Sequence, residues 1–246
     1  MKYSLYNGEV ELDFDENKHL YWVSDKLVPG VTGVLDIIAK PALIGWAVKC
    51  CGLYLEKHLH PGQTYDEIQI KNMIGDMKKS YRKVSGDAAD IGSLVHAWCE
   101  GHIKAKLGLS QPPSMPFNQE SRNAIEAFLQ WERQHEVEYI ASECKIYSRQ
   151  YSYAGTMDLD AIIDGRRTVA DFKTSTGIYR EMALQVALYR QAREEEGYGP
   201  YQDSWIIRVG KDGVFEAQSF PNYTHDLAGG LAALRLHQWS KNGIVK

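Results

Sequence analysis

Cysteine, long apolar runs and excess positive charge are all scarce in this sequence of 246 residues. Its four cysteines form no CxxC pair, which indicates neither a zinc ribbon nor a disulfide framework, and we expect reduced, mostly buried thiols. No apolar run approaches the ~20 residues of a membrane span, and the opening MKYSLYNGEVELDF lacks the apolar core of a signal peptide. We therefore expect a cytoplasmic protein without a membrane partner.

The charge balance is slightly acidic. Lys and Arg number 28, Asp and Glu number 32, and the formal net charge is −4. A general nucleic-acid binder is not indicated, so any binding of that kind needs a local basic patch. The hydrophobic content of 44% excludes a disordered chain. The length suits one or two domains.

Hydrophobic periodicity indicates helices in the first half and a mixture of strands and helices afterwards. We expect helices near 31–39, with Thr32 as N-cap, and near 41–59, 65–83, 86–107, 121–135, 181–196 and 224–241. Strands are expected near 10–14, 20–23, 139–147, 157–163, 168–172, 204–209 and 214–219. This order predicts one mixed α/β domain over residues 1–246, with an N-terminal hairpin and helical part (1–85) and a core (86–246).

Acidic residues and a lysine occupy two neighbouring strands of that core. Asp164-Gly165 is a hairpin signal; with Gly165 and Arg166 as the loop, Asp160 would face Asp171 and Asp158 would face Lys173. Alternation places these four side chains on one face of the sheet. Facing carboxylates repel, and a hard divalent cation such as Mg²⁺ or Mn²⁺ relieves that repulsion. The arrangement suits metal-assisted phosphodiester hydrolysis; the alternative is a surface hairpin with a polar face.

Two helices add candidate residues. His96 and Glu100 share a helix stripe, where His96 is suited to bind a metal or a phosphate and Glu100 to orient it. The alternative is a histidine at the core edge with a glutamate partner. Gln185 and Tyr189 are also four residues apart and follow the Lys173 strand by a short loop, so they are expected to overhang its end.

The best basic patch lies between residues 71 and 83. Its cations form two i,i+4 pairs, Lys78/Arg82 and Lys79/Lys83, which suit a phosphate backbone, and Tyr81 lies among them in a place to stack on a base. The alternative is a solvated helix face.

Four ordered motifs together resemble the PD-(D/E)XK nuclease superfamily, and more narrowly its RecB-like exonuclease branch. They are Gly92-xxx-His96, Gly155-xx-Asp158, Asp171-Phe-Lys173 and Gln185-xxx-Tyr189. The N-terminal His19-Leu-Tyr21 and Val28-Pro-Gly-Val-Thr32 segments are similar to phage exonucleases and to the mitochondrial genome-maintenance exonuclease. The resemblance implies a restriction-endonuclease-like core, with a central mixed β-sheet flanked by helices and a helical N-terminal half.

The resemblance also implies roles for individual residues. Asp158 and Asp171 match the metal-binding acids, with the Phe172 carbonyl completing the site, and Lys173 matches the catalytic lysine. The remaining matches are His96 as a residue at or near the metal, Gln185 and Tyr189 as the helix motif that helps place Lys173 and the DNA, and Glu143 as a further acid.

The sequence departs from the family pattern at two positions. Met157 stands where the superfamily has its proline, as is common in this branch, and Asp160 stands where an apolar residue is usual. Asp160 is then either an extra ligand or an outward-facing acid. The last cysteine, Cys144, precedes the catalytic strands, so no iron–sulfur cluster is expected.

The function implied is that of an exonuclease dependent on Mg²⁺ or Mn²⁺. Its substrate would be single-stranded or end-bearing DNA in recombination, repair or replication, with a protein partner from those processes. The compartment would be the cytoplasm of a bacterial or phage-infected cell. The alternatives are a structure-specific endonuclease of the same fold and a catalytically silent DNA-binding module. The oligomeric state is not readable from the sequence.

Overall fold

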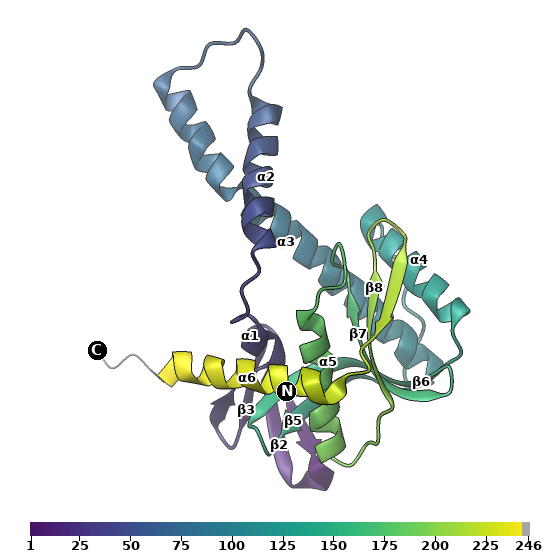
Figure 1. The fold of residues 1–246 in the computed structure, drawn as a ribbon. Coiled ribbons are helices and arrows are strands. Elements are labelled where there is room, and N and C mark those ends of the chain that lie inside the picture. The colour runs from purple at the N-terminus through teal and green to yellow at the C-terminus, as the bar shows by residue number, and fades with distance from the viewer. Residues whose placement is uncertain (243–246) are drawn as a thin grey trace. The chain divides into compact units, whose positions relative to one another are not determined.

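The computed structural model describes residues 1–242, which fall into two compact units (Figure 1). The first unit comprises Met1–Ile38 and the chain from Val95 onward, and the second comprises Ala39–Leu94. In chain order the elements are β1 (Lys2–Leu5), η1 (Tyr6–Gly8), β2 (Val10–Asp15), β3 (Leu20–Val23), β4 (Lys26–Val28), α1 (Val31–Leu35), α2 (Ala42–His58), α3 (Glu67–Lys106), α4 (Gln119–Gln134), β5 (Val137–Ser148), β6 (Tyr153–Ile163), β7 (Arg166–Lys173), α5 (Glu181–Glu195), β8 (Asp203–Val209), β9 (Phe215–Ser219) and α6 (Tyr223–Asn242).

A small antiparallel sheet opens the first unit, in the order β1-β2-β3-β4. The predicted hairpin is confirmed as β2 and β3, and the alternating Val10, Leu12 and Phe14 are all buried. The flanking strands β1 and β4 were not expected from the sequence. They have four and three residues, too few for a periodic pattern, and form by pairing with β2 and β3.

The larger sheet has the order β5-β6-β7-β8-β9, with β7 and β8 parallel and every other pair antiparallel. Helix α4 covers one face, where the Phe128 and Trp131 ring centroids lie 5.3 and 6.2 Å from that of Phe172. Helix α5 covers the opposite face, where Gln185 bonds to Asp171. The mixed α/β class is confirmed: a central mixed sheet is flanked by helices, and the N-terminal half is largely helical.

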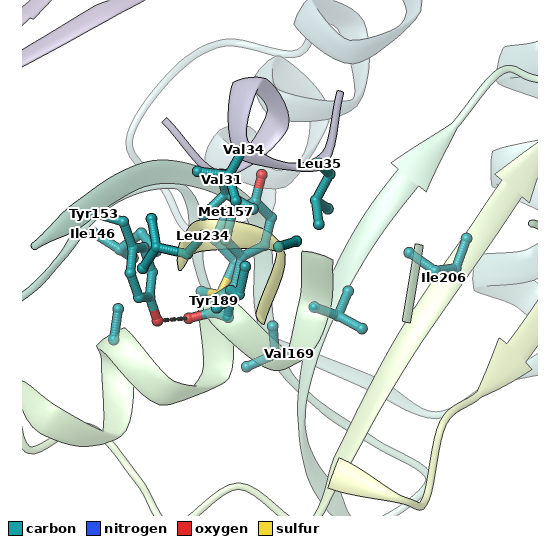
Figure 2. Packing of buried hydrophobic residues seen from close by; sticks show 14 of the residues in the cluster. Val31, Val34, Leu35, Ile146, Tyr153, Met157, Val169, Tyr189, Ile206 and Leu234 are labelled. Atoms are coloured by element: carbon teal, nitrogen blue, oxygen red, sulfur yellow. Dashed lines mark hydrogen bonds between the residues drawn. The ribbon is translucent and has the colours of Figure 1, made fainter. Parts of the chain in front are cut away.

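The main core joins α1, β6, α5 and α6 (Figure 2). Val34 of α1, Met157 of β6 and Leu234 of α6 are buried in one cluster. The Tyr153 hydroxyl donates to the Leu188 carbonyl oxygen at 2.7 Å, which ties β6 to α5. This packing places α5 against the strand that carries the acidic residues.

The β6–β7 hairpin corrects the predicted register. Its loop is Asp164–Gly165, not Gly165–Arg166, because both loop residues have positive φ (49° and 77°), as a two-residue I′ turn requires. Asp160 therefore lies opposite Val169, so its predicted pairing with Asp171 is wrong. The predicted pairing of Asp158 with Lys173 is wrong for the same reason. The observed register differs from the predicted one by two residues. Because this is an even number, the four polar side chains still share one face of the sheet.

Two predicted helix boundaries are also wrong. The helices expected at 65–83 and 86–107 are one continuous helix of 40 residues, α3. Gly86 does not end it, because an interior glycine destabilises a helix by only about 1 kcal/mol relative to alanine. Thr32 lies inside α1, and Gly30, with an extended backbone, is the N-cap residue.

The second unit consists of α2 and the first part of α3. Because α3 continues from this unit into the first, the two are joined by unbroken helix as well as by the segment after α1. The single domain over 1–246 and its division at residue 85 stay predictions. All four cysteines are free thiols, two buried and two half-buried. No helix in the described part of the chain combines the length and apolar run that crossing a membrane requires.

Candidate metal centre

Three potential metal ligands come together at the sheet of the first unit. One ligand atom each from His96, Glu143 and Asp158 lies within 4.8 Å of the other two. His96 Nδ1 is 3.2 Å from Asp158 Oδ2. An imidazole nitrogen and two carboxylates are a donor set that divalent cations accept, so these residues fit a metal ion.

Each of the three comes from a different element. Asp158 is on β6, Glu143 is on β5, and His96 is on the last part of α3. Glu143 lies between two paired positions of β5, and its own φ is +54°, in the left-handed region. For a residue with a side chain that conformation costs roughly 1–2 kcal/mol and is often found at functional sites. The local backbone thus turns the glutamate out of regular strand geometry.

Asp158 and His96 stabilise each other's charge. Burial by itself raises the pKa of Asp158, but His96, Lys173 and the Phe172 N–H outweigh it and hold that pKa below its ordinary value. The Phe172 N–H donates to Asp158 Oδ2 at 2.8 Å. Burial alone lowers the pKa of His96, yet the Asp158 carboxylate raises it to about 9. The pair is therefore an ion pair at neutral pH in the metal-free protein.

Of the two acids in this group, Glu143 is the one whose pKa is raised. Burial, and then repulsion from Asp158, raises its pKa to about 7, against the attraction of Lys145. Lys145 Nζ lies 3.5 Å from Glu143 Oε2 and 4.9 Å from the Phe14 ring centroid. Lys145 was not singled out from the sequence, although its place two residues after Glu143 on a strand is a signal that they share a face.

Asp171 and Lys173 stand beside this group on β7. Lys173 Nζ is 2.6 Å from Asp171 Oδ2, and Gln185 Nε2 donates to Asp171 Oδ1 at 3.0 Å. Burial and the charge of Asp158 raise the pKa of Asp171 to about 6, although Lys173 opposes that shift. Asp171 lies outside the group of three potential ligands, and its role as a ligand stays a prediction.

Because Gly155 has no side chain, Tyr189 can pack against the strand beside the candidate site. A Cβ at Gly155 would lie 2.9 Å from Tyr189 Cε1, inside van der Waals contact, so the ring packs directly on the β6 backbone. The Tyr189 hydroxyl is 2.8 Å from Gln185 Nε2, which also bonds to Asp171. Gly155, Tyr189 and Gln185, all named from the sequence, therefore contact one another in series.

Three other candidates lie differently from the expected arrangement. Glu100 pairs with Lys104 one turn later and is outside the group of three. Asp160 is fully buried and bound by arginines, so the alternative that made it an outward-facing acid is wrong. Phe172 contacts Asp158 through its N–H; a role for its carbonyl stays a prediction.

The basic residues expected to bind DNA belong to the second unit. Lys78, Lys79, Arg82 and Lys83 are exposed on α3, and Tyr81 is half-buried. The Arg82 Nε donates to the Tyr81 hydroxyl at 3.1 Å. Their role in DNA binding stays a prediction.

Comparison with known proteins gives little beyond this geometry. No protein-family model and no curated protein matches the sequence. The crystal structure of SSO0001 is 14% identical, covering 83% of this chain and 89% of that one, with a TM-score of 0.33. An alkaline exonuclease, LHK-Exo from Laribacter hongkongensis, is 10% identical, covering 59% and 82%, with a TM-score of 0.30.

Proposed function

We propose that this protein is a divalent-metal-dependent deoxyribonuclease that hydrolyses phosphodiester bonds. One observation carries the proposal: a cluster of His96 from α3, Glu143 from β5 and Asp158 from β6 stands beside the Asp171–Lys173 pair of β7. Each carboxylate has a cationic neighbour, yet the repulsion between the acids still contributes to the raised pKa values of Glu143 and Asp171, and a bound divalent cation would relieve it. Carboxylates that hold a divalent cation beside a lysine suit metal-assisted hydrolysis of a phosphodiester.

The residues divide into two roles. His96, Glu143 and Asp158 would hold a Mg²⁺ or Mn²⁺ ion, with Asp171 next to it. The bound metal would lower the pKa of a water molecule and offset charge on the phosphate. Hydrolysis adds water across one P–O bond, so the attacking oxygen loses a proton and the leaving oxygen gains one. The Lys173 ammonium, 2.6 Å from Asp171 Oδ2, would orient the attacking water or bond to a phosphate oxygen, and Gln185, which donates to Asp171, would hold that carboxylate in position.

Within this function we favour an exonuclease that acts on single-stranded or end-bearing DNA. The support is the order of the four motifs, which resembles the RecB-like branch, and the exposed cations of α3, which suit a phosphate backbone. A setting in recombination, repair or replication, with a protein partner from it, belongs to the same proposal. A structure-specific endonuclease is the second candidate.

The test is cleavage of 5′- and 3′-labelled single- and double-stranded DNA with Mg²⁺, Mn²⁺ or EDTA. We expect metal-dependent release of nucleotides or short oligomers by the wild type, loss of it in Lys173→Ala, and normal activity in Lys18→Ala, which removes an exposed lysine of a turn. Cuts within closed circles would favour the endonuclease. DNA binding without cleavage under either metal would overturn the proposal and leave a binding module.

A further inference from the structure

Asp160 has an environment that neither of its sequence-based interpretations predicts. It lies two residues after Asp158 on β6, on the same face, and its side chain is fully buried. Arg167 binds both carboxylate oxygens, with Nε 2.8 Å from Oδ1 and Nη2 2.9 Å from Oδ2. Both oxygens are therefore engaged, and Asp160 is not free to bind a metal ion.

Two further groups complete this cluster. The Tyr201 hydroxyl donates to Asp160 Oδ2 at 2.8 Å, and Arg193 Nη2 lies 3.4 Å from the same oxygen. Arg193 is itself buried, with Glu196 3.4 Å away and the Tyr198 ring centroid 3.5 Å from its Cζ. A buried guanidinium needs a counter-ion, and Asp160 and Glu196 both supply one to Arg193.

The cluster connects to the candidate metal centre along one stripe of α5. Gln185, Tyr189 and Arg193 are spaced by four, so they follow one another on the same side of the helix. Gln185 contacts Asp171, Tyr189 packs on Gly155, and Arg193 contacts Asp160. The stripe therefore meets β6 and β7 in three places.

Several directional contacts hold α5 on the sheet, among them the bonds from the Tyr153 hydroxyl to the Leu188 carbonyl oxygen and from Ser148 Oγ to Glu195, and the Arg193–Asp160 pair is the ionic one of the stripe. The other residues that bury α5 include Val186, Leu188 and Ala192, which are apolar. Apolar packing is not directional, so it resists separation of the helix and sheet more than a small slide between them. The charge-assisted contact of Arg193 with Asp160 has a defined donor and acceptor position, which a slide of α5 would break, while Arg167 and Tyr201 hold Asp160 from outside the helix.

We propose that Asp160 is a positioning residue, which holds α5 so that Gln185 bridges Asp171 and Tyr189. This inference rests on the proposed nuclease function and adds to it a determinant of the turnover rate outside the reacting groups. Asp160 touches neither metal nor substrate in this scheme. It acts through Arg193 and the helix.

The test compares Asp160→Asn, which keeps the shape and removes the charge, with Leu12→Ala, which leaves a cavity in the small N-terminal sheet. Both are assayed below their unfolding transitions, with the folded fraction measured. We expect Asp160→Asn to lower kcat per folded molecule about 10- to 100-fold, since a misplacement near 1 Å has an effect of that order. KM for DNA should change less than twofold, and Leu12→Ala should keep the wild-type kcat. Equal kcat values for the two variants would overturn the proposal.

A second readout does not depend on cleavage. In the wild type the Gln185 side-chain amide is buried and bonded to Asp171 and Tyr189, so its protons should exchange slowly with solvent in NMR spectra. Asp160→Asn should speed that exchange at least tenfold while Leu12→Ala leaves it unchanged; unchanged exchange in both variants would refute the positioning role. If the wild type cuts no DNA, the proposed function fails, and this measurement alone decides the role of Asp160.

Discussion

Replacing Gly155 by alanine tests how tightly Tyr189 packs on the catalytic strand. The added Cβ would lie 2.9 Å from Tyr189 Cε1, 3.3 Å from Val31 Cγ2 and 3.4 Å from Ile146 Cδ1. The first of these contacts belongs to a rigid ring that is itself buried, so the ring or the strand must move. The backbone of Gly155 has no positive φ, and steric overlap is therefore the only penalty expected.

The size of the effect follows from two opposing contributions. An extra methyl group in a packed core destabilises by typically 1–3 kcal/mol. Alanine in place of glycine also restricts the unfolded chain, which stabilises by about 0.4–1 kcal/mol where nothing clashes. We expect Gly155→Ala to lower the free energy of unfolding by about 1–2 kcal/mol. Gly33→Ala is the matched control, because a Cβ there meets nothing within 4 Å, and it should be neutral or slightly stabilising.

Urea unfolding of the wild type and both variants gives the measurement, with an unchanged slope m showing that only stability differs. A loss of 1 kcal/mol should lower Tm by about 2–4 °C for a protein of this size. The displaced ring should also disturb Gln185 and reduce kcat. If Gly155→Ala proves as stable as Gly33→Ala, Tyr189 does not press on the strand, and the contact we describe is wrong.

Three further predictions concern charge. Because burial raises the pKa of Asp171 from 3.8 to about 6, the native metal-free protein binds more protons than the unfolded chain in that window, so its free energy of unfolding should fall as the pH rises through it. Glu143 contributes a dependence of the same sign, because its pKa is also raised, to about 7, so in EDTA Asp171→Asn should show a shallower fall than the wild type; identical pH profiles would contradict the shift. Glu143→Gln should weaken Mn²⁺ binding, measured by calorimetry without DNA, by about 10-fold or more, since one of the two carboxylate donors is removed and even outer partners of a metal site contribute that much; an unchanged affinity would exclude Glu143 as a ligand. Replacing Lys78, Lys79, Arg82 and Lys83 together by alanine should reduce the slope of log K against log salt for DNA binding by about 3–4. An unaltered slope would show that these residues form a solvated helix face that does not bind DNA.

The local pattern of the sequence was sufficient for most elements. Alternation identified β2, aromatic and β-branched residues identified β3, and the expected helix at 121–135 is α4, which buries Ala124, Phe128 and Trp131 on one periodic face. It failed for α3, where a glycine within strong helix formers does not end the helix. It also failed for β1 and β4, which exist only through pairing with their neighbours.

For the candidate site, spacing along the chain was enough to name residues but not to assign their partners. The stripe of Gln185 and Tyr189 and the shared face of Asp158 and Asp171 follow from the helical and strand periods. The hairpin register did not, because it depends on which two residues adopt positive φ. Glu143 reaches His96 and Asp158 through a left-handed backbone position that no pattern in the sequence indicates.

Asp160 shows most clearly what could not be predicted from the sequence. Its sequence position places it on the same face as Asp158, and strand alternation determines that much. Its partners, Arg167, Arg193 and Tyr201, come from β7, α5 and the loop before β8, so only the folded chain brings them together. Periodicity acts between neighbours along the chain and so determines which face a side chain occupies. The identity of its counter-ion depends on segments distant in sequence, and that was decided by the tertiary structure.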